Sequence, residues 1–466
     1  MKARYWFGLS LVALAGAGAG YCAIQPTFHP ATEEQLRKTL PPDVLRDKPP
    51  DIAAEGRFNQ IASLGNGLEQ PKLDGQDVMT NREEIHRQNG PLLRMTEALL
   101  EQGPLRVTPS SAGTYEGFPQ VAALKALVKA FSYEAVYDGE NHDGRKCADA
   151  LIDGLRLSDA AMNTDGRVID ILVAVACKAI AMKVTATSVR KGYLDSEELK
   201  RVLAAIPPTT PSNPQLADAL RHEWRDAIFA KDTGLLSISN QGRKAVTDGE
   251  GHGMVGNFDA LETAKGFAGL YFIEISNAML PWTKQDPGIS KYADLAKELP
   301  QDPDAEYGDS PDQAKKPSKL AYEVRMNRIP NSLGKNLIAI VANTGFGSLS
   351  VSTSTNAELV RTLIAVQLYR NDHDGKAPAS LQELVSQHYL PSLPIDRFCE
   401  KPLHYDLRPG VIYSVGSNLV DDHAGFDNEA QPNQLDFGYY LIPPKPKVSA
   451  VPGGPPGSFL SKPGKK

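Results

Sequence analysis

The residues best suited to chemistry lie near the middle of the chain, in the run His222-Glu223-Trp224-Arg225-Asp226. This run approaches the His-Glu-x-x-His pattern, in which two imidazoles one helical turn apart bind zinc and the glutamate acts as a base. Here Asp226 stands one turn after His222, and the sequence shows no third ligand. Two interpretations stay open: a hydrolytic site that His222, Glu223 and Asp226 complete with distant residues, and a solvent-facing helix stripe.

Other catalytic motifs are incomplete. The series Gly251-x-Gly253-x-x-Gly256 has the glycine spacing of a dinucleotide site, but polar residues precede it where a hydrophobic strand is required. The acidic run at 137–144 lacks the register of a calcium loop and is typical of a turn between helices. Neither a Gly-x-Ser-x-Gly elbow nor a phosphate-binding loop is present. The sequence therefore favours a non-enzymatic protein.

The composition excludes several classes of protein. Hydrophobic residues make up 41% of the 466, which is enough for a core and argues against disorder. The net charge of −6 argues against a protein that coats nucleic acid, so we expect no nucleic-acid partner. The 4 cysteines are too few for a disulfide scaffold. Of these, Cys147, Cys177 and Cys399 show no metal or redox spacing, and we expect free thiols.

The N-terminus predicts export. Lys2 and Arg4 precede an uncharged apolar stretch at 5–24, which is long enough to cross about 30 Å of hydrocarbon. Residues 1–24 are therefore a cleaved signal peptide or an uncleaved membrane anchor, and Cys22 adds lipid attachment as a third outcome. Each outcome places the remainder of the chain in the periplasm, either free or anchored in the inner membrane.

Hydrophobic periodicity and breaker residues divide the rest of the chain. We expect an arm with short helices at 25–110, a helical domain at 111–298, an acidic proline-rich linker at 299–318, a C-terminal domain at 319–442 and a disordered basic tail at 443–466. Within these, Thr32 and Asn81 are expected to cap helices, Pro91 to begin one, and 233–258 to form a long loop.

The C-terminal block carries the clearest order of elements. An apolar stripe including Leu359 and Leu363 predicts a helix, and Ser380 is expected to begin a short second one. Residues 403–407 and 411–415 alternate on either side of a turn, which predicts a hairpin. Residues 437–442 would supply the third strand of a small sheet.

This block resembles the C-terminal domain of the major pseudopilin of type II secretion systems, and a similar block ends many exported bacterial proteins behind a helical region. The resemblance rests on the runs Leu368-Tyr369-Arg370-Asn371-Asp372-His373-Asp374-Gly375, Pro378-Ala379-Ser380-Leu381-Gln382-Glu383-Leu384, Tyr389-Leu390-Pro391-Ser392-Leu393-Pro394-Ile395-Asp396, Lys401-Pro402-Leu403-His404-Tyr405 and Tyr413-Ser414-Val415-Gly416. The apolar stretch at 5–24 lacks the glutamate through which pseudopilins assemble, so we do not expect incorporation into a pilus.

The resemblance implies a calcium site in the loop between the last two strands, because the pseudopilin family binds calcium there. The residues available in this loop are Asn418, Asp421, Asp422, Asp427 and Asp436. Hard oxygen ligands are those that calcium prefers, and a divalent cation would relieve the repulsion between the carboxylates. The loop departs from the family pattern, since Asn418-Leu419 stands where the family has Asp-Gly. A solvated acidic loop without calcium is the alternative.

Together these features predict an α+β protein: a helical bundle or helical-hairpin stack, followed by a small pseudopilin-like domain with an antiparallel sheet of about three strands. The expected function is assembly or partner binding at the cell envelope. An envelope protein is the expected partner, and the membrane is a second one if residues 1–24 stay attached. An exported hydrolase with a site built from distant residues is the alternative.

Overall fold

The computed structural model describes residues 27–45, 49–72, 81–107, 118–164, 166–231, 234–248, 257–300, 325–342, 346–408, 410–425 and 436–442. The expectations for the segment 1–24, for most of the linker and for the basic tail therefore lie outside the described residues. Among the helices of the described part, none combines the length and the apolar character needed to cross a membrane.

The fold is α+β and mostly helical, as the sequence predicts, with 14 helices that hold about 63% of the described residues. The helices are α2 (Glu33–Arg37), α3 (Ile52–Asn66), α4 (Arg82–Glu101), α5 (Phe118–Glu140), α6 (Gly144–Met162), α7 (Val168–Arg190), α8 (Ser196–Ala204), α9 (Pro214–Phe229), α10 (Leu235–Asp248), α11 (Ala260–Ala278), α12 (Ser290–Glu298), α14 (Ser332–Ala342), α15 (Phe346–Asp372) and α16 (Leu381–Ser386). The strands are β1 (Phe28–His29), β2 (Phe258–Asp259), β3 (Ile395–Asp396), β4 (Lys401–Pro402), β5 (His404–Asp406), β6 (Val411–Ser414) and β7 (Phe437–Tyr440).

The expected C-terminal sheet is confirmed. Strands β5, β6 and β7 pair antiparallel in that order, and residues 407–410 connect the first two. Tyr413 pairs with Gly438, where a Cβ atom would lie 2.0 Å from the Ile412 carbonyl oxygen. Glycine is therefore required for β7 to approach β6 this closely.

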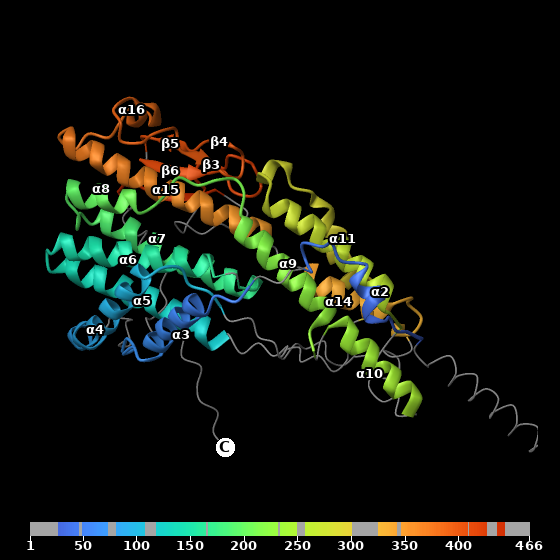
Figure 1. Cartoon of the computed structure of the whole chain (residues 1–466). Helices are drawn as coiled ribbons and strands as arrows, with labels where there is room; N and C mark the ends of the chain where they lie inside the picture. The colour runs from blue at the N-terminus through green and yellow to red at the C-terminus, as the bar shows by residue number, and fades with distance from the viewer. Residues whose placement is uncertain are drawn as a thin grey trace, which may run out of the picture.

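Helix α15 joins this sheet to the helical region. It contacts α7 and α8 as well as β3, β6 and β7, and Figure 1 shows it lying between α8 and the strands. Its residues Leu359, Val360, Leu363 and Ile364 are all at most 2% exposed. A helix that is apolar on several faces is buried on several faces. One hydrophobic core therefore includes side chains of α3 to α8, of α15 and of the sheet.

A second core lies at the other end of the molecule, where α2, α9, α10, α11 and α14 pack together (Figure 1). Strand β1 pairs in parallel with β2, and this pairing brings residues 28–29 beside 258–259. The first half of α7 contributes Val168, Ile171 and Val175 to this core, while Cys177 and Met182 of its second half belong to the first. Helix α7 therefore connects the two cores.

The two hydrophobic cores do not coincide with the segments into which the sequence divides the chain. Residues between 31 and 44 pack into the second core, whereas residues between 58 and 105 pack into the first. The C-terminal block shares its core with the helices that precede the linker. Burial of apolar faces determines which segments meet, and these contacts bring together segments that are far apart in the sequence.

Three local expectations are wrong. Pro91 lies inside α4 and does not begin a helix, because Ile85 and Leu93 on either side of it are both buried. Asn81 precedes α4 but does not cap it; its side chain bonds the backbone of residues 70 and 72. The expected loop at 233–258 contains α10, whose Leu235 is 1% exposed and packs in the second core.

A buried network of charged groups ties α15 to the chain around it. The Glu358 Oε1 atom accepts hydrogen bonds from the Thr209 backbone N–H at 2.7 Å and from the Thr209 hydroxyl at 2.8 Å. Arg397 donates to the Thr209 carbonyl oxygen at 2.6 Å, and Arg361 donates to the Ile206 carbonyl oxygen. Glu358 and Arg361 are 5% and 6% exposed. Burial lowers the pKa of Arg361, whereas the Glu358 carboxylate raises it.

The first prediction concerns this network. Glu358→Gln keeps the shape of the side chain but leaves the buried Arg361 guanidinium without its carboxylate, while Arg397 keeps its ion pair with Glu400 at 3.5 Å. We expect the free energy of unfolding to fall by about 3 kcal/mol, because removing one partner of a buried ion pair leaves an uncompensated charge. Guanidinium-induced unfolding measures this change. The control is Glu197→Gln at an exposed helix start, and an equal effect of both substitutions would contradict the assignment.

Candidate functional site

The loop that follows β6 is the first candidate site. Leu419, His423 and Ala424 have positive φ angles, and Asp421 anchors the loop. The Asp421 carboxylate accepts a hydrogen bond from the Tyr413 hydroxyl at 3.1 Å and one from the His423 backbone N–H at 2.9 Å. These bonds, together with the nearby histidines, hold the pKa of Asp421 below its usual value although burial acts to raise it.

The other expected calcium ligands differ in the hydrogen bonds that they already form. Asp436 is fully buried, and its Oδ2 atom accepts a hydrogen bond from the Ala424 backbone N–H at 2.8 Å. Its Oδ1 atom is buried without a hydrogen-bond partner, and burial raises the pKa of this carboxyl group. Asn418 donates to the Asp422 carboxylate at 3.0 Å. Asp427 lies outside the described residues.

The loop offers oxygen donors, which are the kind that suits calcium. The described donors, however, do not converge on one point. The unpaired Oδ1 of Asp436 is the type of atom that a cation satisfies. However, Asp421 already bonds Tyr413, and Asp422 already bonds Asn418. Asp421, Asp422 and Asp436 do not form one of the convergent groups of three metal-ligand side chains found among the described residues. Calcium binding at this loop therefore stays a prediction.

The second prediction tests calcium directly on the full chain, because the sheet shares its core with the helices. A ligand that binds the native state alone stabilises it by about 2.7 kcal/mol at a hundred times its Kd. We expect calcium to raise the Tm of the wild-type protein and to have less effect on Asp421→Asn. The exposed Asp406→Asn is the control. An unchanged Tm at millimolar calcium would reject the site.

A cavity between α7, α9, α11 and α14 is the second candidate. Its volume is about 260 Å³, and Arg167, Glu223, Asp226 and Tyr271 supply its polar lining. The structure thus brings Glu223 and Asp226 together in one cavity, as the sequence hypothesis requires. His222 is half-buried and does not line the cavity. The remaining lining residues are apolar and include Phe267 and Leu337 of two other helices.

The two carboxylates of this cavity have different surroundings. Asp226 forms an ion pair with Arg167 at 2.9 Å. Burial and the neighbouring Asp226 charge both raise the pKa of Glu223, and burial is the larger cause. Burial also raises the pKa of Tyr271. Two neighbouring carboxyl groups in different surroundings are the arrangement that general acid–base catalysis uses.

Sequence reasoning missed Arg167 and Tyr271. Arg167 precedes α7 and Tyr271 lies on α11, so they are far from Glu223 in the sequence. No local spacing identifies such residues, because only the packing of α7, α9 and α11 brings them to the cavity. The same packing buries Glu274 on α11, where burial raises the pKa to about 7.

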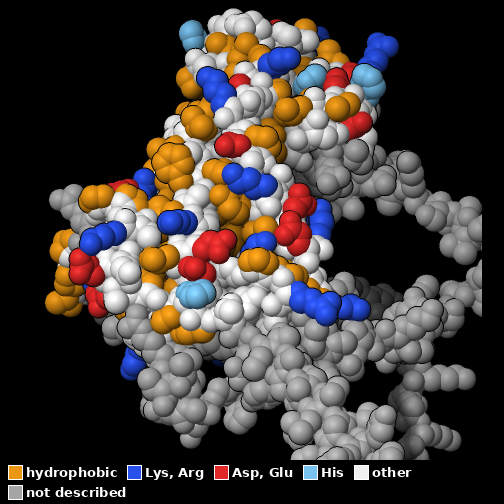
Figure 2. Space-filling model, turned by 90° about the vertical axis from the view of Figure 1, so that its right-hand side faces the viewer, with side chains coloured by type: hydrophobic (Ala, Val, Ile, Leu, Met, Phe, Trp, Pro, Cys, Tyr) orange, Lys and Arg blue, Asp and Glu red, His pale blue; other side chains and the backbone are white. Residues whose placement is uncertain are grey.

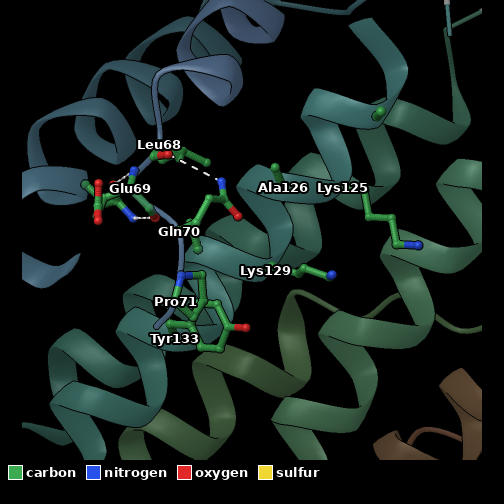
Figure 3. Close-up of a pocket in the computed structure, with 11 residues that line it drawn as sticks. Leu68, Glu69, Gln70, Pro71, Lys125, Ala126, Lys129 and Tyr133 are labelled. Atoms are coloured by element: carbon green, nitrogen blue, oxygen red, sulfur yellow. Dashed lines mark hydrogen bonds between the residues drawn. The ribbon is translucent and has the colours of Figure 1, made fainter. Parts of the chain in front are cut away.

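A third feature is a cavity of about 260 Å³ between α5 and the segment 68–71. Figure 3 shows Lys125, Lys129 and Tyr133 along α5, with Glu69 and Gln70 across from them. Asn89 holds this segment, since its side chain accepts from the Glu69 N–H at 2.8 Å and donates to the Glu69 carbonyl at 3.1 Å. Neither lysine forms an ion pair with a described residue, so the cavity has a cationic rim.

The described cysteines carry no chemistry of their own in this structure. Cys147 and Cys177 are buried, Cys399 is half-buried, and none of the three forms a disulfide. Burial raises the pKa of the Cys147 and Cys177 thiols to about 12. A thiol with a raised pKa is a poor nucleophile, because the thiolate is the reactive form.

On the face shown in Figure 2, Lys and Arg side chains alternate with Asp and Glu side chains and with hydrophobic groups, and no broad field of one sign is visible.

No protein-family model, curated protein or solved structure matches the chain. The proposed function therefore depends on the sequence and the geometry of this chain.

Proposed function

We propose that the chain is an exported or membrane-anchored envelope protein that binds a protein partner through its pseudopilin-like C-terminal module. The helix, hairpin and third strand of this module follow the order that the resemblance implies. The cationic N-terminus and apolar segment at 1–24 support export. Fold analogy does not by itself determine function, so the proposal also needs a surface that fits a partner.

One surface feature carries the partner proposal. Leu419 and Val420, in the first part of the loop after β6, are 45% and 54% exposed, and they are adjacent apolar side chains. Leu419 has a positive φ angle, and the hydrogen bonds that Asp421 accepts hold this part of the loop in place. Exposed apolar groups on a preorganised loop favour protein binding, because little conformational entropy is lost when they are buried.

The third prediction follows from this surface. Affinity-tagged full-length protein is cross-linked in cells and recovered from envelope fractions. We expect the double substitution Leu419→Asp with Val420→Asp to reduce the recovered partner about tenfold, which corresponds to 1.4 kcal/mol. The matched control is Leu407→Asp in the turn after β5, which is 47% exposed.

Equal recovery of the partner by both variants would contradict the role of the loop. A separate measurement tests the compartment. A reporter fused behind residue 30 is expected to be active outside the cytoplasm, and retention of this reporter in the cytosol would overturn the envelope assignment.

The cavity at Glu223 favours a second candidate function, an exported hydrolase. Burial raises the pKa of Glu223, so this carboxyl group keeps its proton to a higher pH, and Asp226 forms an ion pair with Arg167 in the same cavity. Tyr271 adds a hydroxyl group to the same cavity. In this mechanism Glu223 donates a proton to the leaving group, and Asp226 activates water or stabilises positive charge.

The fourth prediction tests this candidate with purified protein and a panel of chromogenic esters, glycosides and peptides. If a substrate is hydrolysed, Glu223→Gln is expected to lower the rate about 10²- to 10⁴-fold, because it removes the transferable proton. The control is Glu262→Gln at the start of α11, outside the cavity. Loss of activity that is equal in both variants, or no hydrolysis at all, would reject the hydrolase.

A further inference from the structure

Three potential metal ligands meet between α4 and α5, on other elements than the loop after β6 and the cavity at Glu223. His86 lies on α4, and Glu134 and Asp138 lie on α5. Glu134 and Asp138 are four residues apart, so their side chains lie on the same face of the helix. One ligand atom from each of the three residues lies within 4.8 Å of the other two.

Two of the three residues, His86 and Asp138, have potential ligand atoms to which the described protein makes no hydrogen bond. The Nδ1 atom of His86 lies 2.8 Å from Glu134 Oε1, but it is buried and has no hydrogen bond of acceptable geometry. Asp138 is 5% exposed, and no hydrogen bond or ion pair with a described residue reaches its carboxylate. Burial raises the pKa of Asp138 and the charge of Lys146 lowers it, but Lys146 forms its ion pair with Asp143, at 2.9 Å. A carboxylate buried in this way is costly unless something compensates its charge.

The imidazole is also held in place. The ring of His86 stacks on Tyr137 with the centroids 4.3 Å apart and an angle of 20° between the planes. The Tyr137 hydroxyl donates to Glu83 at 2.9 Å, which restrains Tyr137 in turn. Contacts that restrain the ring of a histidine ligand are typical of metal sites, where outer residues orient the ligands.

We propose that His86, Glu134 and Asp138 form a binding site for a divalent transition metal, with zinc as the ion. One imidazole nitrogen and two carboxylate oxygens suit zinc, whereas calcium and magnesium prefer oxygen ligands alone. Two ligands of a tetrahedral zinc ion lie about 3.3 Å apart, so the group needs only small side-chain movements to close on the metal.

Three protein ligands leave the fourth position of the metal open. The His86 side chain is 38% exposed although its Nδ1 atom is buried, so the group lies close to the protein surface. Metal sites with three protein ligands and an open position are the kind that polarise a bound water or substrate. The site is independent of the C-terminal module, and its failure would leave the proposed function unaffected.

A second zinc-binding place must be distinguished in the test. His404 and His423 flank Asp421, with Nδ1 atoms 3.5 Å and 3.6 Å from its carboxylate oxygens. These two histidines and Asp421 do not form a convergent group, but they can bind zinc weakly at a surface. His423→Ala removes this place and leaves the proposed site intact.

The fifth prediction uses full-length protein that has been stripped of metal with a chelator and titrated with zinc chloride. Calorimetry is expected to show one zinc per chain, and zinc is expected to raise the Tm. Asp138→Asn and His86→Ala should each weaken zinc binding at least about tenfold, because each removes a ligand. His423→Ala should bind zinc as the wild type does.

A second readout separates a metal ligand from a residue that only supports the fold. Without zinc, Asp138→Asn is expected to melt at or above the Tm of the wild type, because it removes an uncompensated buried charge. The site would be overturned if the wild type binds no zinc. It would also be overturned if Asp138→Asn and His86→Ala bind zinc as tightly as the wild type, or if His423→Ala alone abolishes binding.

Discussion

The carboxylate of Glu358 is the constraint on which the arrangement of this protein depends. It lies on α15, buried beside Arg361 and Arg397, and it accepts two hydrogen bonds from Thr209. A charge that is removed from water must be compensated by neighbouring groups, and here they come from the chain after α8 and from the chain after β3. The network therefore specifies how three distant segments meet, whereas hydrophobic contacts alone would tolerate small shifts between them.

The carboxyl groups of Asp138 and Glu223 differ from that of Glu358 in their surroundings. Asp138 is almost fully buried without a hydrogen bond from a described residue, and burial raises the pKa of Glu223 in its cavity. A buried carboxylate with several hydrogen-bond partners stabilises a structure, while one without them, or one with a raised pKa, is common where a ligand binds or a reaction takes place. This contrast is the physical reason for placing the candidate chemistry at α4, α5 and α9 and the structural role at α15.

The shared core affects how the C-terminal module can act. Its sheet packs on α15, and α15 packs on α7 and α8, so the module shares its main core with the helices and adds only a small cluster of its own around Val411 and Tyr413. Helix α7 continues from this core into the second one. A partner bound at the loop after β6 would therefore contact an element that is rigidly connected to the helical region. This packing of the sheet against the helices is a property of the whole chain.

Local signals in the sequence were sufficient for several elements. The capping box of Thr32 and Gln35 starts α2, and Asp195 caps α8, because these bonds form within one turn of helix. The turn between β5 and β6 and the third strand were also predictable, since alternation and a tight turn specify a hairpin locally.

Tertiary structure decided the rest. It kept α4 continuous through Pro91, made α10 helical, and directed Asn81 to a neighbouring segment. It also placed Arg167 beside Asp226 and His86 beside Glu134. Such pairs depend on which helix faces pack together, and this is settled by the burial of the whole chain and not by the spacing of residues along it.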